Sequence, residues 1–427
     1  MNEALHISQL GALSTLTMGQ SPDSAAVNDS EAGLPFLQGC AEFGSRFPKP
    51  RVHCSLPLRI AKFGSILISV RAPVGTTNRA DRDYCIGRGL GAVLAKPGIT
   101  DDLFLLHAIQ ANLNFLHRRS QGSTFLAVSS KDLLSMPIAA PSLATQRRIA
   151  DILSTVDETI AQTEALIAKY QQIKAGLMHD LFTRGVTADG LLRPTREHAP
   201  ELYEESQLGS IPKHWGTYPI SVIADSLVDG PFGSNLKTEH YVVESGVRVV
   251  RLQNIQEGRY NDSDRAFVSQ QHADYLARNT VHPGDVLVAA LGEDNYPVGR
   301  ACCYPDELPP AINKADCYRL RCKSEIALNA YMGHFLNTVA ARNQVRRFEQ
   351  GVTRRRTNLG NFRRVIVALP DIEEQIRIVD LLTSASSCIE SAEMVVAKLR
   401  QQKLGLMHDL LTGRVRVKQP ESETERV

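Results

Sequence analysis

The sequence predicts an α+β protein built from two mixed α/β domains and two long helices that pair as a coiled coil, arranged as an internal repeat. Three observations support this prediction. Residues 176–181 recur letter for letter at 405–410, and the match extends without a gap back to Gln-Gly-x-Thr sequences at 121–124 and 350–353. The segments that end in these copies keep an apolar period of 3.5 residues. The regions before them alternate Gly and Pro with short β-branched runs.

Upstream of the matched stretch the two halves diverge, apart from one strand-like pair at 64–69 and 284–289. A kept scaffold therefore carries two dissimilar domains. The segments that follow from this pattern are a first domain at 1–140, a first helix at 141–186, a linker at 187–210, a second domain at 211–369, a second helix at 370–417 and a disordered tail at 418–427.

Both long helices carry a seam of apolar residues at alternating steps of four and three, which is typical of coiled-coil packing. Lys174 and Lys403 occupy the same position in the two seams, where a polar group penalises other registers. Each helix has roughly 40 residues, is about 60 Å long and cannot bury its seam alone. The simplest partner for each helix is the other, and pairing with a second copy of the protein is the alternative. The seam residues are Ile149, Leu153, Val156, Ile160, Ile167, Tyr170 and Leu177 in the first helix and Ile378, Leu382, Ile389, Val396, Leu399 and Leu406 in the second.

Capping residues mark the starts of both helices. Ser142 follows a proline and can cap the first helix. Asp371 also follows a proline, and Glu374 stands three residues later, which is the spacing of a capping box. A capping role explains Asp371 without a nuclease site.

A strongly basic segment precedes the second helix. Each domain is expected to end in one helix, at 101–120 and at 326–349, that leads into the Gln-Gly-x-Thr turn. Around the second turn Glu349 is the one acid, and such a cluster repels itself unless an anion faces it. Phosphate is the obvious candidate, because guanidinium groups bind phosphate oxygens; a solvated positive face is the alternative. The arginines are Arg342, Arg346, Arg347, Arg354, Arg355, Arg356, Arg363 and Arg364.

Composition and motif content exclude several other classes of protein. The chain of 427 residues has a net charge of +2, which identifies no class of partner. No apolar run is long enough to cross a membrane, and Glu3 stands where a secretory signal has basic residues, so we expect a cytoplasmic protein. The eight cysteines lack zinc-site spacing, and no P-loop occurs. We therefore expect no catalytic residue, no metal and no cofactor in this chain.

Four motifs in each half together resemble those of the specificity subunits of type I restriction-modification systems. The first half contains Met-Gly-Gln-Ser-Pro at 18–22, Pro-Phe-Leu-Gln-Gly at 35–39, Ile-Ser-Val-Arg-Ala-Pro-Val-Gly at 68–75 and Cys-Ile-Gly-Arg-Gly-Leu at 85–90. The second half contains Ile-Pro-Lys-His-Trp at 211–215, Gly-Pro-Phe-Gly-Ser at 230–234, Val-Arg-Leu-Gln-Asn-Ile at 250–255 and Pro-Gly-Asp-Val-Leu-Val at 283–288. The first half lacks a Pro-x-x-Trp opening, so its first strand is expected to be shorter.

This resemblance implies two target-recognition domains that each read one part of a split double-stranded DNA sequence. It implies that the two helices pack antiparallel as a spacer, which gives a pseudo-twofold repeat. It also implies two docked modification subunits, which methylate adenine with S-adenosylmethionine, and separate restriction subunits, which use ATP and Mg to translocate and cleave DNA in phage defence. A spacer of tens of ångströms can hold two readers about one DNA turn, roughly 34 Å, apart.

The residues expected at the DNA lie on and beside the two Gln-Gly-x-Thr turns. The turn residues that read bases cannot be separated at this point from those that bind phosphate. Two rival classes are a coiled-coil protein–protein scaffold without DNA recognition and a self-sufficient nuclease or methyltransferase. The candidates are Arg118, Arg119, Gln121, Ser123 and Thr124 in the first half and Arg346, Arg347, Gln350, Thr353, Arg354, Arg355 and Arg356 in the second.

Overall fold

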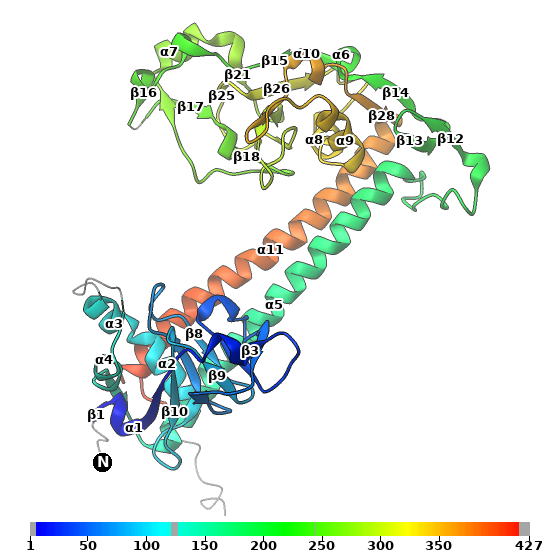
Figure 1. The fold of residues 1–427 in the computed structure, drawn as a ribbon. Helices are drawn as coiled ribbons and strands as arrows, with labels where there is room; N and C mark the ends of the chain where they lie inside the picture. Colours follow the sequence, from blue (N-terminus) through cyan, green and yellow to red (C-terminus); the bar gives the residue numbers. More distant parts are fainter. Residues whose placement is uncertain (1–5, 121–126, 244, 418–427) are drawn as a thin grey trace, which may run out of the picture. The chain divides into compact units, whose positions relative to one another are not determined.

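The computed structural model describes residues 6–120, 127–243 and 245–417 and divides into two compact units. Unit 1 comprises Met1–Leu166 and Ala392–Val427, and unit 2 comprises Ile167–Ser391. Two long helices, α5 (Leu143–Thr183) and α11 (Ile372–Leu411), contribute to both units (Figure 1). Unit 1 therefore contains the start of α5 and the end of α11, and unit 2 contains the rest of both. The expected tail lies outside the described residues.

In the described part of unit 1, a four-stranded antiparallel sheet has the order β2-β10-β7-β8. A five-stranded sheet has the order β3-β5-β4-β9-β6, in which β4 and β9 are parallel, and β1 pairs with β11. The strands are β1 His6–Gln9, β2 Ser14–Met18, β3 Val27–Asn28, β4 Leu34–Leu37, β5 Val52–Cys54, β6 Ile60–Ala61, β7 Ile66–Ser69, β8 Thr77–Arg79, β9 Tyr84–Ile86, β10 Leu90–Ala95 and β11 Pro137–Ala140. The short helices are α1 Leu10–Leu13, α2 Asp102–Ala111, α3 Leu113–Ser120 and α4 Ser130–Leu134, with 3-10 turns η1 Ser24–Ala26 and η2 Cys40–Glu42.

In the described part of unit 2, a four-stranded antiparallel sheet has the order β15-β26-β22-β24, and a five-stranded sheet has the order β16-β20-β17-β25-β21 with β17 and β25 parallel. Strand pairs β14–β28, β12–β13, β18–β19 and β23–β27 accompany them. The strands are β12 Tyr203–Ser206, β13 Gly209–Pro212, β14 Gly216–Pro219, β15 Ala224–Val228, β16 Tyr241–Val242, β17 Val247–Val250, β18 Ile255–Gln256, β19 Arg259–Tyr260, β20 Phe267–Val268, β21 Thr280–Val281, β22 Val286–Ala289, β23 Leu291–Gly292, β24 Ala301–Cys303, β25 Ala311–Asn313, β26 Cys317–Cys322, β27 Arg355–Arg356 and β28 Ile366–Leu369. The short helices are α6 Ile220–Ile223, α7 Gln270–Tyr275, α8 Asn329–Phe335, α9 Val339–Arg347 and α10 Leu359–Phe362, with 3-10 turns η3 Pro200–Leu202, η4 Gly233–Asn235, η5 Thr238–His240, η6 Leu252–Asn254 and η7 Ala277–Asn279.

The two units share one strand order, although their sequences differ in these regions. Each four-stranded sheet is antiparallel, and the parallel pair of each five-stranded sheet stands at the same place. The strand-like pair predicted from the repeat forms β7 and β22, which hold the same position in the two four-stranded sheets. Strands β1 and β14 have four residues each, so the expectation of a shorter first strand in the first half is wrong.

Strands β7 and β22 are buried on both faces, which explains their continuous apolar sequences. In β7, Ile66 and Ile68 join the core that includes helix α2, while Leu67 faces a second core. In β22, Val286 and Val288 join the core that includes helix α8, and the alternate residues again face a second core. The two sheets of each unit therefore share a buried layer.

Two helices stand where one was expected in each domain: α2 and α3 in unit 1, and α8 and α9 in unit 2. The prediction of one helix in each domain is therefore wrong. In unit 1, Asn112 separates α2 from α3, and its side-chain amide donates to the Ala108 carbonyl at 2.8 Å. In unit 2, Thr338 separates α8 from α9 and caps α9, because its Oγ1 accepts the Ala341 N–H at 3.3 Å. Asn and Thr side chains bond to nearby backbone groups and so compete with helix continuation.

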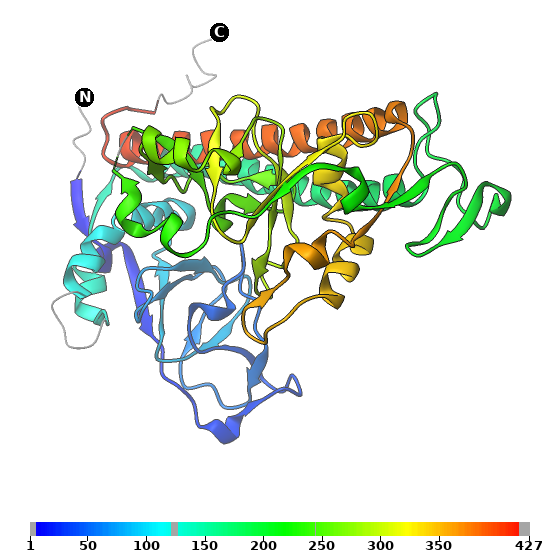
Figure 2. The same cartoon turned by 90° about the horizontal axis from the view of Figure 1, so that it is seen from above.

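The predicted seam residues of α5 and α11 are all buried or half-buried, and most residues between them are exposed. In unit 1, Ile149 and Leu153 of α5 share a core with Leu410 of α11. In unit 2, Leu181 at the end of α5 shares a core with Ile378 near the start of α11. Within each unit the two helix segments run side by side, as both views show (Figure 2).

Ion pairs between the helix segments of unit 1 reveal their relative direction. Lys403 Nζ lies 2.6 Å from Asp157 Oδ1, and Arg400 Nη2 lies 2.6 Å from Glu164 Oε1. From Asp157 to Glu164 the residue numbers of α5 increase, whereas those of their partners in α11 decrease from Lys403 to Arg400. The two helix segments are therefore antiparallel in this unit.

Each seam lysine lies near a histidine of the neighbouring domain, of which His107 is buried and His334 is half-buried. Lys403 is close to His107 of α2, and Lys174 is close to His334 of α8. Burial, aided by the lysine charge, lowers the pKa of both histidines to about 4. Both imidazoles are therefore neutral at neutral pH, and in each unit a lysine of a long helix acts electrostatically on a histidine of the domain.

Gln146 and Gln375, which the repeat pairs, make the same contacts in the two units. Oε1 of Gln146 accepts the Asp101 N–H at 3.0 Å, and Oε1 of Gln375 accepts the Leu328 N–H at 2.9 Å. Each Nε2 donates to the carbonyl of the proline five residues earlier, also at 2.9 Å. Each buried amide thus ties the start of a long helix to the loop before α2 or α8.

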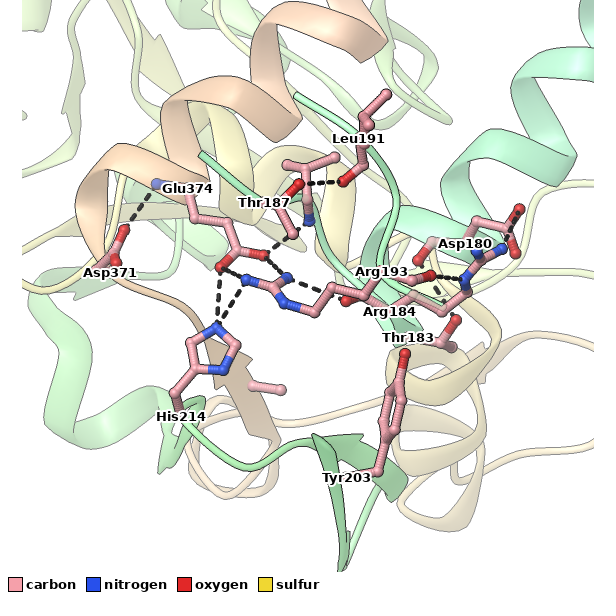
Figure 3. Close-up of polar contacts among 12 residues, drawn as sticks. Asp180, Thr183, Arg184, Thr187, Leu191, Arg193, Tyr203, His214, Asp371 and Glu374 are labelled. Carbon is pink, nitrogen blue, oxygen red and sulfur yellow. Dashed lines mark hydrogen bonds and ion pairs between the residues drawn. The ribbon is translucent and has the colours of Figure 1, made fainter. Parts of the chain in front are cut away.

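Glu374 at the start of α11 fixes the segment that follows α5 (Figure 3). Asp371 accepts the Glu374 N–H at 2.8 Å and so caps the helix as predicted. The Glu374 carboxylate does not serve the expected capping box. It accepts from the Val186 N–H at 2.9 Å and from Arg193 Nη2 at 2.8 Å, and it lies 3.1 Å from His214 Nε2. This network fastens the expected linker, which includes η3 and β12, to α11 within unit 2.

We expect Glu374→Gln to lower the free energy of unfolding by about 3 kcal/mol, because it leaves the mostly buried Arg193 guanidinium without its carboxylate. Burial by itself raises the pKa of the Glu374 carboxyl, but hydrogen bonds from Arg193, His214 and the Val186 N–H together hold this pKa below its usual value. The stabilisation is therefore present above the pKa of glutamate in the unfolded chain. It is lost as the pH falls through the lower folded-state value. Urea unfolding at neutral and acid pH measures both effects.

Glu373→Gln is the matched control, because Glu373 is the exposed neighbour in the same helical turn. Its expected effect on the free energy of unfolding is less than about 1 kcal/mol. Equal losses in the two variants would show that the Glu374 network contributes nothing specific.

Candidate nucleic-acid interface

The basic segment of the second half forms a hairpin turn beside the four-stranded sheet of unit 2. Strand β27 pairs with β23, which follows β22 closely in the chain. Gln350 and Arg356 exchange two backbone hydrogen bonds of 2.9 Å, which close the turn. Gly351 has a φ of +98°, a conformation that glycine adopts without strain. The tip of the turn therefore consists of residues 351–354.

The structure places the predicted contact residues of the second half on this turn and on the end of α9. Thr353 and Arg354 lie at the exposed tip, and Gln350 is exposed at its base. Arg346 and Arg347 are exposed in the last turn of α9.

Three arginines of the basic cluster bind carboxylates of their own domain. Arg355 Nη2 lies 2.9 Å from Asp294 Oδ1, and Arg356 Nε lies 2.6 Å from Asp316 Oδ1. The buried Arg342 donates to Glu257 Oε1 at 2.6 Å. The expectation that a bound anion must balance the whole cluster is therefore wrong for these three, because acids distant in sequence neutralise them.

Five other arginines have no such carboxylate. Among the residues that the structure describes, no ion pair is formed by Arg346, Arg347, Arg354, Arg363 or Arg364. Their guanidinium groups remain exposed and able to bind an anion such as a phosphate oxygen.

Two exposed aromatic rings come from segments that contact the basic cluster. Phe232, in the Gly-Pro-Phe-Gly-Ser segment, lies under the Arg356 guanidinium at 5.2 Å from the ring centroid. Tyr296 belongs to the turn that follows β23 and is about half exposed. Exposed aromatic rings beside basic groups can stack on nucleic-acid bases.

The corresponding region of unit 1 is described only in part. Arg118 is exposed at the end of α3. Arg119 donates to Asp132 at 3.2 Å and to Ser135 at 3.1 Å, and its guanidinium stacks 4.2 Å from the Phe115 ring centroid. The predicted contact residues Gln121, Ser123 and Thr124 lie outside the described residues.

The described ranges contain neither a metal-binding cluster nor a membrane-spanning helix. No group of three or more His, Cys, Asp or Glu residues within them is arranged to hold a metal ion. No helix within them is long and apolar enough to cross a membrane.

A family model for the type I restriction modification DNA specificity domain matches residues 58–172 and 247–401, which together are more than half of the chain. The chain belongs to this type I specificity family. The family expected from the sequence motifs is therefore confirmed.

Two relatives from Methanocaldococcus jannaschii are specificity subunits of type I restriction enzymes. The MjaX subunit is 36% identical over 168 residues, an alignment that covers 39% of this chain and 40% of that subunit. The MjaVIII subunit is 25% identical over 327 residues, covering 76% of this chain and 72% of that subunit.

Two solved structures resemble the fold of the chain over nearly its whole length. The specificity subunit of M. genitalium has a TM-score of 0.58 at 15% identity and covers 96% of this chain and 97% of its own. A chain from a study of assembly and conformational transition of the type I restriction-modification system has a TM-score of 0.56 at 14% identity, with 96% and 98% covered. At these identities the likeness concerns the fold alone.

Proposed function

We propose that this chain is the DNA-reading, non-catalytic subunit of a cytoplasmic type I restriction-modification complex. Each unit carries one recognition domain that reads one part of a split double-stranded target. Helices α5 and α11 pair antiparallel as a coiled coil, hold the two domains as a pseudo-twofold repeat and set the gap between the two target parts. The observation that carries this proposal is that both units have the same strand order although their sheets differ in sequence. Each unit also packs on segments of the same two helices.

The chemistry of the hairpin supports DNA as the ligand. Its tip presents Thr353 and Arg354, and α9 adds two exposed arginines without carboxylate partners among the described residues. Such groups bind phosphate and release counterions from the duplex, and an arginine can also reach the guanine edge in the major groove.

Exposed apolar side chains on the long helices support docking of other subunits. In unit 1 these include Leu166, Met394 and Leu404, and in unit 2 they include Ile173 and Ile376, all of them more than 40% exposed. Contiguous apolar surface marks protein interfaces, and we propose that these side chains contribute to such a surface. Two modification subunits would dock there and methylate adenine with S-adenosylmethionine. Translocation and cleavage with ATP and Mg would belong to further restriction subunits.

An exchange of one domain tests the proposal. The complex is reconstituted with residues 1–140 replaced by the recognition domain of a relative, and methylated adenines are mapped across the host genome. We expect one half of the methylated motif to change, because the other domain and both helices are retained. The reciprocal exchange of 211–369 should change the other half alone. A change of both halves in either chimera would refute independent reading, and a coiled-coil adaptor without DNA recognition would leave the motif as it was.

A further inference from the structure

Two neighbouring arginines of the basic hairpin have carboxylate partners of very different character. Arg355 pairs at 2.9 Å with Asp294, whose side chain is 85% exposed, and lies at the longer distance of 3.9 Å from the less exposed Glu349. Arg356 pairs with Asp316, whose side chain is 18% exposed. The first pair lies in solvent, where an ion pair contributes little to stability. The second pair is part of a larger hydrogen-bonded assembly.

Asp316 is fixed by its backbone as well as its side chain. Its N–H donates to Asp229 Oδ1 at 3.1 Å, and its carbonyl accepts the Ala290 N–H at 2.8 Å. Its φ of +67° is in the left-handed region, which aspartate tolerates better than most residues. Ala290 in turn accepts the Thr357 N–H at 3.0 Å, one residue beyond Arg356. Asp316 and Thr357 at the end of the hairpin are thus both hydrogen-bonded to the backbone of Ala290, which directly follows β22.

The Arg356 side chain is held on two sides. Its Nε and Nη2 both donate to Asp316 Oδ1, and its guanidinium lies over the Phe232 ring. The backbone of Arg356 is in turn hydrogen-bonded to Gln350 on the other side of the turn, so the position of Arg356 also fixes the base of the turn. The Asp316 carboxylate occupies the Nε–Nη2 edge of Arg356, and a phosphate could bind through both nitrogens of that edge only if the carboxylate were released.

We propose that Asp316 is a positioning residue of the DNA interface, which holds Arg356 so that the tip at 351–354 is presented in one orientation. Arg356 is then a support, and Arg354 at the tip is the contact. This inference rests on the proposed function. A positioning role explains why the Asp316 carboxylate lies beside a surface that binds DNA. Without such a role, its negative charge would repel the DNA phosphates and only weaken binding.

The test compares Asp316→Asn with Asp294→Asn, because both substitutions remove one negative charge beside the hairpin and Asn tolerates the backbone of residue 316. The full chain is assayed with its modification subunits on two duplexes, the target found by methylation mapping and a mixed-sequence control. We expect Asp294→Asn to tighten both duplexes equally, by up to about twofold. We expect Asp316→Asn to weaken target binding about fivefold and to lower the ratio of target to control affinity, because the ion pair is replaced by a weaker hydrogen bond from the guanidinium to a neutral amide oxygen. Tighter binding by both variants would overturn the proposal.

Arg356→Lys is the second variant, and it decides the question if Asp316→Asn fails to fold. Lysine keeps the charge and still binds phosphate, but it cannot reproduce the contact that two guanidinium nitrogens make. A positioning role predicts a loss of target preference like that of Asp316→Asn, whereas a phosphate contact predicts retained affinity and would overturn the inference. Failure of the proposed function has a different signature, because alanine at Arg346, Arg347 and Arg354 would then leave DNA binding unchanged as well.

Discussion

Alanine at Arg346, Arg347 and Arg354 together is expected to weaken duplex DNA binding about 100-fold and to make the salt dependence shallower by about three units of slope. These guanidinium groups are exposed, and none pairs with a carboxylate in the described part of the chain. Each therefore can neutralise one phosphate without first breaking an internal ion pair. Fluorescence anisotropy over a series of salt concentrations measures both quantities.

Lysine at the same three positions is the matched control. It preserves charge and therefore the salt slope, but it removes the planar fork that binds a phosphate or guanine edge through two hydrogen bonds. We expect this variant to keep most of its affinity for mixed-sequence DNA and to lose preference for the target. An unaltered salt slope in the alanine variant would exclude this surface from the DNA interface.

Periodicity in the sequence predicted the part of the fold that depends on local pattern. The 3.5-residue period identified the residues that are buried along α5 and α11, since a sustained apolar stripe requires a partner. The strand pair β7 and β22 was predicted because both are short apolar runs. The breaks within the two late helices were missed, although Asn112 and Thr338 are residues that commonly end or cap helices.

The partners of the basic cluster could not be predicted, because they come from distant parts of the chain. Asp316 is 40 residues from Arg356 in sequence, and the two meet only after β26 and the hairpin are placed side by side. The spacing of Glu374 from Asp371 predicts a capping box. The Glu374 carboxylate is 181 residues from Arg193, and no local signal indicates that contact.

Insertion of four residues into α5 after Gln162, with four more into α11 after Leu399, is expected to abolish modification of the original target and to lengthen its gap. The two sites face each other approximately, because Glu164 pairs with Arg400. Four helical residues add about 6 Å and a net rotation of about 40°. One base pair of duplex adds about 3.4 Å and roughly 34° of rotation, so the gap should grow by about one to two base pairs.

The same four residues inserted at the exposed Asp189-Gly190 turn provide the control. That turn follows α5 and contributes nothing to its length, so the gap should stay as it is in the parent. Loss of modification in both insertions would indicate damage to folding, which thermal unfolding detects.

The central claim is that one chain holds two dissimilar DNA readers at a distance set by two paired helices. Sequencing of methylated adenines in cells that carry the parent chain or the doubly inserted chain tests it most directly. The predicted result is a motif with the same two halves and a gap longer by about one to two base pairs. The same gap in parent and variant, with both halves still methylated, would contradict the claim.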